Sequence, residues 1–185
     1  MRSTVIILVL IAYSLGGCAN PVNRVTSENY AEDCSVAERN GRLDIAEEAC
    51  YRALVNVNWG NLGPGLKSQR LYNLGRVKRQ LEKFEEAEKL FQDSLAVEAN
   101  ISDPSSPKIG RRNVELAVNL AGQSKWNEGA KYLDLAIPNI PEFSKTERLY
   151  VANVLIEFSK KLDALGQGHM AHHFKRTAES INEET

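Results

Sequence analysis

Apolar residues recur at helical spacing along most of the chain, most regularly between residues 71 and 99. The first stripe of this segment comprises Leu71, Leu74, Lys78 and Leu81. The second stripe, beyond a turn at Lys83 and Phe84, comprises Ala87, Phe91, Leu95 and Ala99. Spacings of three, four and seven residues place each set on one face of a helix. Two such helices joined by a short turn predict a helical hairpin.

This hairpin pattern repeats along the chain with a nearly constant period. A small residue follows the turn of each unit, and the equivalent positions are Ala46, Ala87, Gly129 and Ala171. These positions are separated by 41, 42 and 42 residues. The sequence therefore predicts an all-α fold of about four stacked hairpins over residues 28–181, followed by a tail at 182–185.

The second unit carries two specific motifs. Leu74-Gly75 lies in its first helix, and Ala87 precedes Phe91 by four residues in its second helix. This pattern resembles the tetratricopeptide repeat (TPR). The period is longer than the common one of about 34 residues and is similar to that of kinesin light chains, with ISDPSSPKIG and WGNLGPGLKSQ as extended loops. The resemblance implies a right-handed superhelical solenoid with a protein-binding concave face.

The first twenty residues have a different pattern. Arg2 precedes an apolar run that is too short to span a bilayer and that leads into the quartet LGGC. A positive start, a short apolar centre and small residues predict a secretory signal peptide over residues 1–17. The quartet resembles the lipobox of bacterial lipoproteins, which implies a lipidated Cys18 and a tether over residues 18–27. An ordinary secretory signal with an incidental cysteine is the alternative.

The lipobox resemblance also implies a location. Ala19 follows Cys18 at a position where an aspartate often signals retention in the inner membrane. The resemblance therefore favours the outer membrane, with the protein facing the periplasm. Two or more acyl chains, palmitate among them, are sufficient for stable anchoring.

Lipidation of Cys18 leaves two cysteines in an oxidising compartment, where disulfides persist. Cys34 and Cys50 flank the turn of the first unit, and each lies eight residues from Arg42. In an antiparallel hairpin, equal distances from the turn place two residues at the same height. Both cysteines fall on inward stripes, so we predict a Cys34–Cys50 disulfide. Two buried free thiols are the alternative.

Charge and motifs argue against several functions. The formal net charge is -1, with 23 basic against 24 acidic residues, and loss of Arg2 with residues 1–17 leaves 22 against 24. A chain this close to neutral is not expected to bind nucleic acid. His169, His172 and His173 lack the glutamate of the H-E-x-x-H zinc motif, and SSPK matches S-x-x-K without its companion motifs. We therefore predict no enzyme activity, no metal and no cofactor.

A polar stripe lies beside the packing stripe of the best-formed unit. Together with one arginine of the third unit, its members are Tyr72, Asn73, Arg76, Arg79 and Arg111. Tyrosine and arginine are favoured anchors at interfaces. A concave groove with three arginines would suit an acidic segment or a free carboxylate of a partner. Ordinary surface arginines with partners four residues away are the alternative.

These features together predict a lipid-anchored adaptor of the cell envelope that binds a protein or peptide partner through a TPR groove. The process would be assembly, secretion or the regulation of cell-wall enzymes. A permanent structural subunit of an envelope complex is the alternative.

Overall fold

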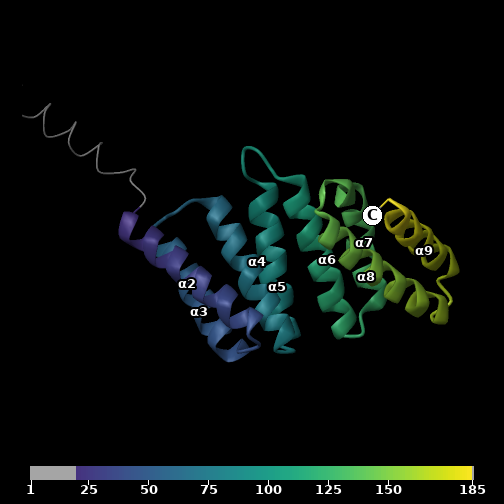
Figure 1. Ribbon diagram of the computed structural model, residues 1–185, viewed down its shortest axis with the longest axis horizontal. Coiled ribbons are helices and arrows are strands. Elements are labelled where there is room, and N and C mark those ends of the chain that lie inside the picture. The colour runs from purple at the N-terminus through teal and green to yellow at the C-terminus, as the bar shows by residue number, and fades with distance from the viewer. Residues whose placement is uncertain (1–19, 185) are drawn as a thin grey trace, which may run out of the picture.

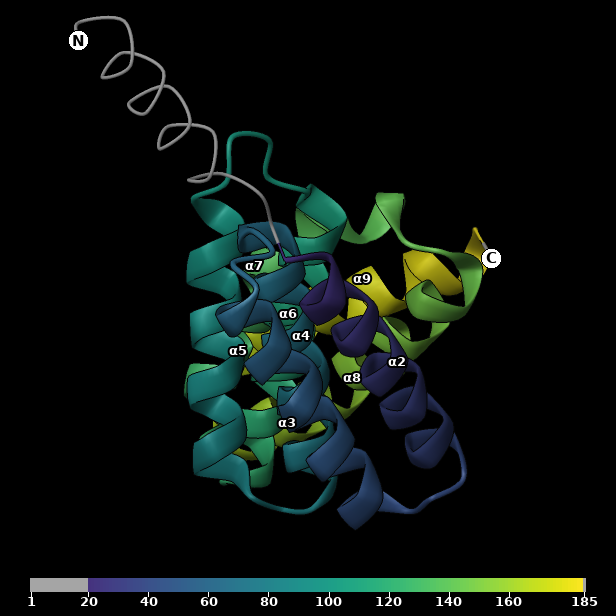
Figure 2. The same ribbon diagram turned by 90° about the vertical axis from the view of Figure 1, so that its left-hand side faces the viewer.

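The structure, a computed structural model, describes residues 20–184, which form a row of packed helix pairs (Figure 1). The elements in chain order are α2 (Pro21–Arg39), α3 (Leu43–Trp59), α4 (Pro64–Gln80), α5 (Phe84–Ala99), α6 (Ser106–Gly122), α7 (Trp126–Ala136), the 3-10 helix η1 (Ile137–Glu142), α8 (Lys145–Ala164) and α9 (Gly168–Glu183). Viewed from the N-terminal end, the pairs stack behind one another (Figure 2). This arrangement confirms the predicted all-α solenoid of four hairpins.

The turns within the four pairs share one backbone geometry. Each contains a residue with a positive φ, namely 69° at Gly41, 58° at Glu82, 62° at Ser124 and 76° at Gly166. The next residue donates its N–H to a carbonyl five positions earlier, as from Arg42 to Ala37 over 2.9 Å. A left-handed residue here ends a helix while satisfying its last carbonyl groups. The turn chemistry therefore recurs with the same period as the apolar pattern.

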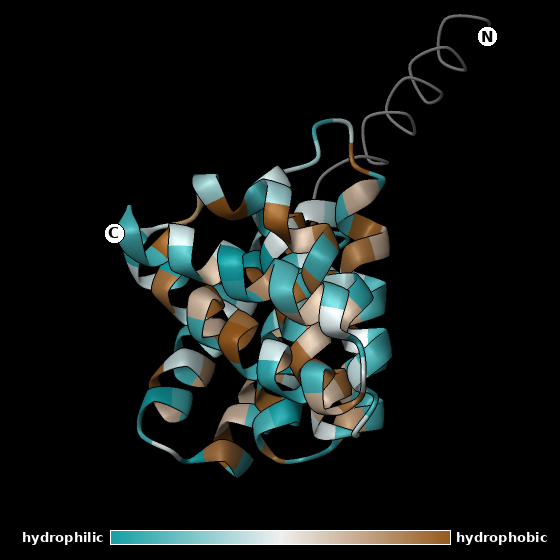
Figure 3. Cartoon of the chain, turned by 90° about the vertical axis from the view of Figure 1, so that its right-hand side faces the viewer, coloured by the Kyte–Doolittle hydropathy of each residue, from teal (hydrophilic) through white to brown (hydrophobic). Residues whose placement is uncertain are grey.

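Small residues let the two helices of each pair approach closely. The helices at the C-terminal end of the row carry both hydrophobic and hydrophilic residues around their circumference (Figure 3). The small residues after the four turns, Ala46, Ala87, Gly129 and Ala171, are all buried. A Cβ atom added to Gly75 would lie 2.9 Å from the ring of Phe91, and one added to Gly129 would lie 2.8 Å from the carbonyl oxygen of Ala117. Side-chain volume at these positions thus sets the distance between the paired helices.

The first helix begins earlier than the apolar pattern predicts. Asn20 caps α2 with its side chain, and Pro21 occupies the first turn, where proline is favoured. Ser27, near the middle of α2, is fully buried against α3. The tether predicted for residues 18–27 is therefore corrected, because residues 21–27 belong to the first hairpin. A polar residue at the buried contact masked the helical period in the sequence.

The connections between units also differ in part from the prediction. Because Pro64 starts α4, the connection after α3 is confined to residues 60–63 rather than the whole of WGNLGPGLKSQ. The connection after α5 spans residues 100–105. In the third unit α7 gives way to η1, because Pro138 and Pro141 cannot donate the backbone N–H groups that a continuing α-helix requires.

A disulfide joins the two helices of the first unit. Cys34 of α2 and Cys50 of α3 are bonded, with their Cα atoms 5.2 Å apart. This separation lies within the usual range for disulfides. Both residues are buried, and in the second unit Gly75 and Phe91 occupy the equivalent positions. The first unit thus replaces a glycine–aromatic contact by a covalent bond, as the sequence predicts.

Opening this disulfide should lower the free energy of unfolding by about 3 kcal/mol, because a loop of this length restricts the unfolded chain by roughly that amount. The measurement is denaturant unfolding of a Cys34→Ala, Cys50→Ala double variant beside the wild type. Reductant is the control, since it should lower the stability of the wild type and leave the variant unchanged. A wild-type transition that reductant does not move would contradict the stabilising role.

Candidate protein-binding face

The first helices of successive pairs converge on a shared hollow. A small cavity of about 70 Å³ is lined by residues of α4, α6 and α8 and of the turn before α8, namely Tyr72, Arg111, Val114, Glu115, Phe143, Glu147, Tyr150 and Val151. Three consecutive units therefore contribute to one site. Repeat proteins use such surfaces for extended contacts with partners. We call this side of α2, α4, α6 and α8 the inner face.

The residues predicted to form a groove lie on two neighbouring first helices. Tyr72, Asn73, Arg76 and Arg79 belong to α4, and Arg111 belongs to α6. Tyr72 and Arg111 line the cavity itself. Asn73 Oδ1 accepts a hydrogen bond from the side chain of Gln69 at 2.8 Å. The predicted set is thus brought together on one side, although only two of its members reach the cavity.

Each of the three arginines already has a carboxylate partner on a neighbouring first helix. The pairs, with their N–O distances, are Arg76–Glu38 (2.6 Å), Arg79–Glu115 (2.8 Å) and Arg111–Glu147 (2.6 Å). The partners are 36 or 38 residues apart in the sequence. They therefore link α2 to α4, α4 to α6, and α6 to α8. We call this row of ion pairs the inter-repeat ladder.

The ladder changes the ligand that the inner face can be expected to bind. Its positive and negative charges balance, so the arginines do not present the free positive charge expected from the sequence. An acidic ligand would have to displace a carboxylate that is already in contact. The alternative of partners four residues away is also wrong for these arginines, because all three partners lie on another helix.

Two tyrosines give the inner face an aromatic and hydrogen-bonding character. Burial, reinforced by the nearby carboxylate of Glu115, raises the pKa of Tyr150 to about 12. The same two causes raise the pKa of Tyr72. Both hydroxyls are therefore protonated at neutral pH. Neither hydroxyl has a hydrogen-bond partner within residues 20–184, so each can both donate to and accept from a bound segment.

A buried polar cluster lies between the second and third units. The hydroxyls of Ser68 (α4) and Ser94 (α5) each donate to the backbone carbonyl of the other, at 3.1 and 2.8 Å. Arg112 of α6 donates to the hydroxyl oxygens of Ser94 at 2.6 Å and of Ser68 at 2.8 Å. The carboxylate of Glu98 lies 3.4 Å from the same guanidinium, and both side chains are almost completely buried. This cluster ties one unit to the next through the core.

The sequence contains a signal for this cluster that an analysis of apolar stripes misses. Ser27 and Ser68 are one period apart, and so are Arg70 and Arg112. Arg70 donates to the hydroxyl oxygen of Ser27 at 3.3 Å, which repeats the Arg112–Ser68 contact one unit earlier. A polar pair that recurs at the repeat period thus marks a contact between units.

The candidate catalytic and metal-binding residues lie at the start of α6 and on α9. Within residues 20–184, no three His, Cys, Asp or Glu side chains lie together in a way that could hold a metal ion. His173 pairs with Asp134 at 3.2 Å, and His169 and His172 are exposed. The segment 105–108 forms the cap and first turn of α6.

Reversing one charge of the inter-repeat ladder should destabilise the fold. Arg76→Glu places a second carboxylate beside Glu38 in a partly buried position, with an expected loss of about 1 kcal/mol. The double variant Glu38→Arg, Arg76→Glu should recover most of that loss, because it restores an ion pair of opposite polarity. Denaturant unfolding measures both.

Arg24→Glu is the control for this charge reversal, because the ion pair that Arg24 forms within residues 20–184 is a long one, at 3.9 Å to the exposed Glu28. Its effect should stay within about 0.5 kcal/mol. A double variant as unstable as Arg76→Glu alone would show that the ladder does not stabilise the solenoid.

Comparison by sequence finds no matching family model and no matching curated protein. Comparison by structure finds BtubC (BKLC) from P. vanneervenii, with a TM-score of 0.74 and 18% identity over 88% of this chain. This chain spans 65% of that structure, which is less than two thirds of it. A Podosopora anserina structure described as a kinesin light chain with nearly identical TPR-like repeats has a TM-score of 0.65 and 16% identity, and covers 95% of this chain and 82% of its own.

MamA is a further structural neighbour, with a TM-score of 0.64 and 13% identity over 85% of this chain and 79% of its own. Identities this low establish the architecture and nothing beyond it. The resemblance drawn from the sequence is confirmed at that level: the chain has a TPR-like helical-repeat fold.

Proposed function

We propose that this chain is a lipid-anchored adaptor of the cell envelope that binds a protein partner along its inner face. The observation that carries the proposal is the cavity to which α4, α6 and α8 all contribute. A site assembled from three consecutive units suits an extended or helical peptide better than a single small group. The TPR-like fold supports the same class of function.

The inner face favours a partner of mixed polarity. Tyr72 and Tyr150 offer aromatic surface at the cavity, and their hydroxyls offer hydrogen bonds. The ladder presents both signs of charge in one row. A segment with uncharged polar side chains, or with charges of alternating sign, can match this row without leaving a desolvated charge unpaired. A purely acidic segment is not the expected ligand of this face.

The anchor rests on the sequence around Cys18, which lies outside the described residues. The quartet LGGC supports lipidation of that cysteine, and Ala19 supports the outer membrane, with the protein facing the periplasm. Each helix within residues 20–184 is too short or too polar to cross a bilayer. Because α2 begins at Pro21, an anchored Cys18 would hold the first hairpin close to the membrane surface.

An exposed apolar group lies at the same end of the solenoid. Val22, Val25 and Trp59 are 69%, 56% and 78% exposed. The ends of the two helices that carry them meet, because the N–H of Asn20 donates to the carbonyl of Gly60 at 3.2 Å. Tryptophan is favoured at the boundary between lipid and water. The group therefore supports an orientation in which the N-terminal end of the solenoid contacts the membrane.

Cys18→Ser should abolish the incorporation of radiolabelled palmitate and move the protein out of the membrane fraction, because this one residue would carry all the acyl chains. Cys34→Ser is the matched control, since it removes a cysteine outside the lipobox and should leave labelling intact. Equal labelling of the wild type and Cys18→Ser would rule out the anchor. It would not bear on the proposal that a partner binds to the inner face.

A photoreactive amino acid at Asn73 should capture a partner in intact cells. The same amino acid at Lys89, an exposed position on α5, is the control and should not capture that partner. Tyr150→Ala should lower the yield from position 73 severalfold, because it removes aromatic contact area from the cavity. Identical adducts from positions 73 and 89, or a yield that Tyr150→Ala does not change, would argue against the inner face as the binding surface.

A further inference from the structure

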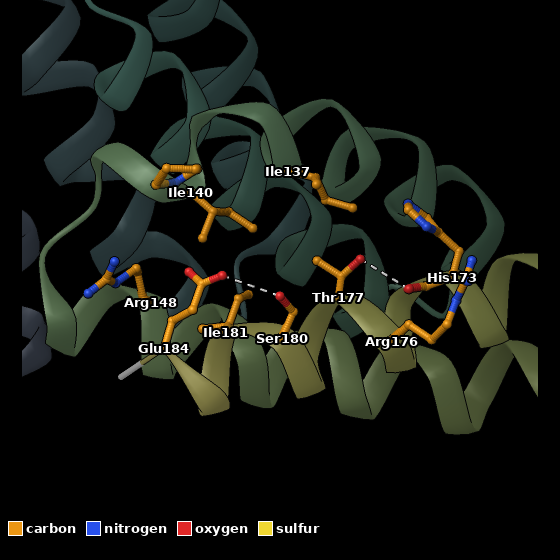
Figure 4. A pocket seen from close by; sticks show the side chains of 10 residues that line it. Ile137, Ile140, Arg148, His173, Arg176, Thr177, Ser180, Ile181 and Glu184 are labelled. Carbon is orange, nitrogen blue, oxygen red and sulfur yellow. Dashed lines mark hydrogen bonds between the residues drawn. The ribbon is translucent and has the colours of Figure 1, made fainter.

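The third unit departs from the repeat pattern and opens a cleft beside α9. The second helices α3 and α5 have 17 and 16 residues, whereas α7 has only 11 before η1 begins. The two prolines of η1 prevent α7 from continuing beside α9. The space between η1 and α9 forms a cleft of about 370 Å³ (Figure 4).

The walls of this cleft differ in character. Ile137 and Ile140 of η1 form an apolar wall. The opposite wall is a stripe of α9 that includes the hydroxyl groups of Thr177 and Ser180. Figure 4 shows Arg148 at one end of the cleft and Arg176 at the other. The cleft thus combines aliphatic surface, hydroxyl groups, two cationic groups and one carboxylate, that of Glu184.

The two arginines differ from those of the inter-repeat ladder, because they have no anionic partner among the residues that the structure describes. Neither guanidinium forms an ion pair or a side-chain hydrogen bond within residues 20–184, and the Nε atom of Arg148 is buried without a hydrogen-bond partner. The carboxylate of Glu184, which also lines the cleft, accepts from the Ser180 hydroxyl at 3.4 Å. His173 is paired with Asp134 outside the lining.

A buried, unpaired guanidinium nitrogen is unfavourable unless a ligand or water satisfies it. A carboxylate matches a guanidinium in both charge and geometry, since it can accept two parallel N–H groups. An aliphatic side chain next to the carboxylate in the ligand could pack against Ile137 and Ile140 and remove further apolar area from water. On the α9 wall, the hydroxyl oxygens of Thr177 and Ser180 could accept hydrogen bonds from the N–H groups of the peptide backbone.

We propose that the cleft between η1 and α9 binds a short peptide segment of a partner protein in which a carboxylate side chain lies next to an aliphatic one. The carboxylate pairs with Arg148. Arg176, at the opposite end of the cleft, adds positive charge that attracts the same carboxylate over a longer distance. The aliphatic side chain packs on η1. The cleft shares no lining residue with the inner-face cavity, so this inference goes beyond the function proposed above and does not depend on it.

Three fluorescein-labelled hexapeptides test the proposal against the full chain in detergent, with binding followed by fluorescence anisotropy. The first peptide has a central Leu-Glu pair between glycine and serine residues. The second has Gln in place of Glu, and the third has Ser in place of Leu. The first should bind, and each of the others should bind about tenfold more weakly, because each has lost one of the two contacts.

Variants of the chain locate the site. Arg148→Gln should weaken binding of the Leu-Glu peptide by about tenfold, the equivalent of one charge-assisted contact. Arg176→Gln should weaken it severalfold, and because Arg176 is exposed this variant tests the cleft even if Arg148→Gln folds poorly. Arg42→Gln is the matched control, because Arg42 is an exposed arginine of the first unit, outside the cleft, and also has no anionic partner within residues 20–184.

Three results would overturn the proposal. The first is no binding of the Leu-Glu peptide to the wild type at millimolar concentration. The second is equal binding to the wild type and to an Arg148→Gln, Arg176→Gln double variant whose circular dichroism is unchanged. The third is equal binding of the peptide that lacks leucine, which would reduce the cleft to a site for any anion.

Discussion

The ring of Phe91 lies so close to Gly75 that one additional carbon atom on the glycine would overlap it. This contact sets the distance between α4 and α5, and the close approach of Gly129 to the carbonyl oxygen of Ala117 does the same for α6 and α7. The distance within a pair in turn decides where the next first helix can dock. The inter-repeat ladder requires successive first helices at a fixed separation, because its side chains span the gap between them. The hollow of the inner face therefore depends on packing that lies outside it.

The fold was predictable because its signal is local and repeated. Small residues after each turn and apolar stripes on each helix recur at one period, and that period survives even where single residues change. The start of α2 was missed because Ser27, a polar residue, fills its buried contact. The shortening of α7 was missed because the apolar stripes carry no signal for it, whereas Pro138 and Pro141 end the α-helix early.

The candidate site was predictable only in part. Residues on one stripe of a helix can be placed together from spacing alone, and the predicted groove set does share the inner face. Spacing along one helix does not reveal which charged side chains form ion pairs with another helix and which remain unpaired. Glu38 is 38 residues from Arg76, and the pairing depends on the distance and rotation between two helices that are not adjacent in the chain. Arg148 and Arg176, which form no ion pair within residues 20–184, lie instead beside η1, where two prolines interrupt the repeat.

The disulfide also determines how the first unit responds to a pulling force. In a chain held by its N-terminus, tension enters at the start of α2 and would otherwise peel that helix away from α3 over its whole length. The bond between Cys34 and Cys50 transfers the load directly into α3. The residues between the two cysteines are then shielded from the load, which passes into the part of α3 after Cys50 and the units beyond it. A covalent bond at this level therefore keeps the turn of the hairpin nearest the predicted anchor from being pulled open.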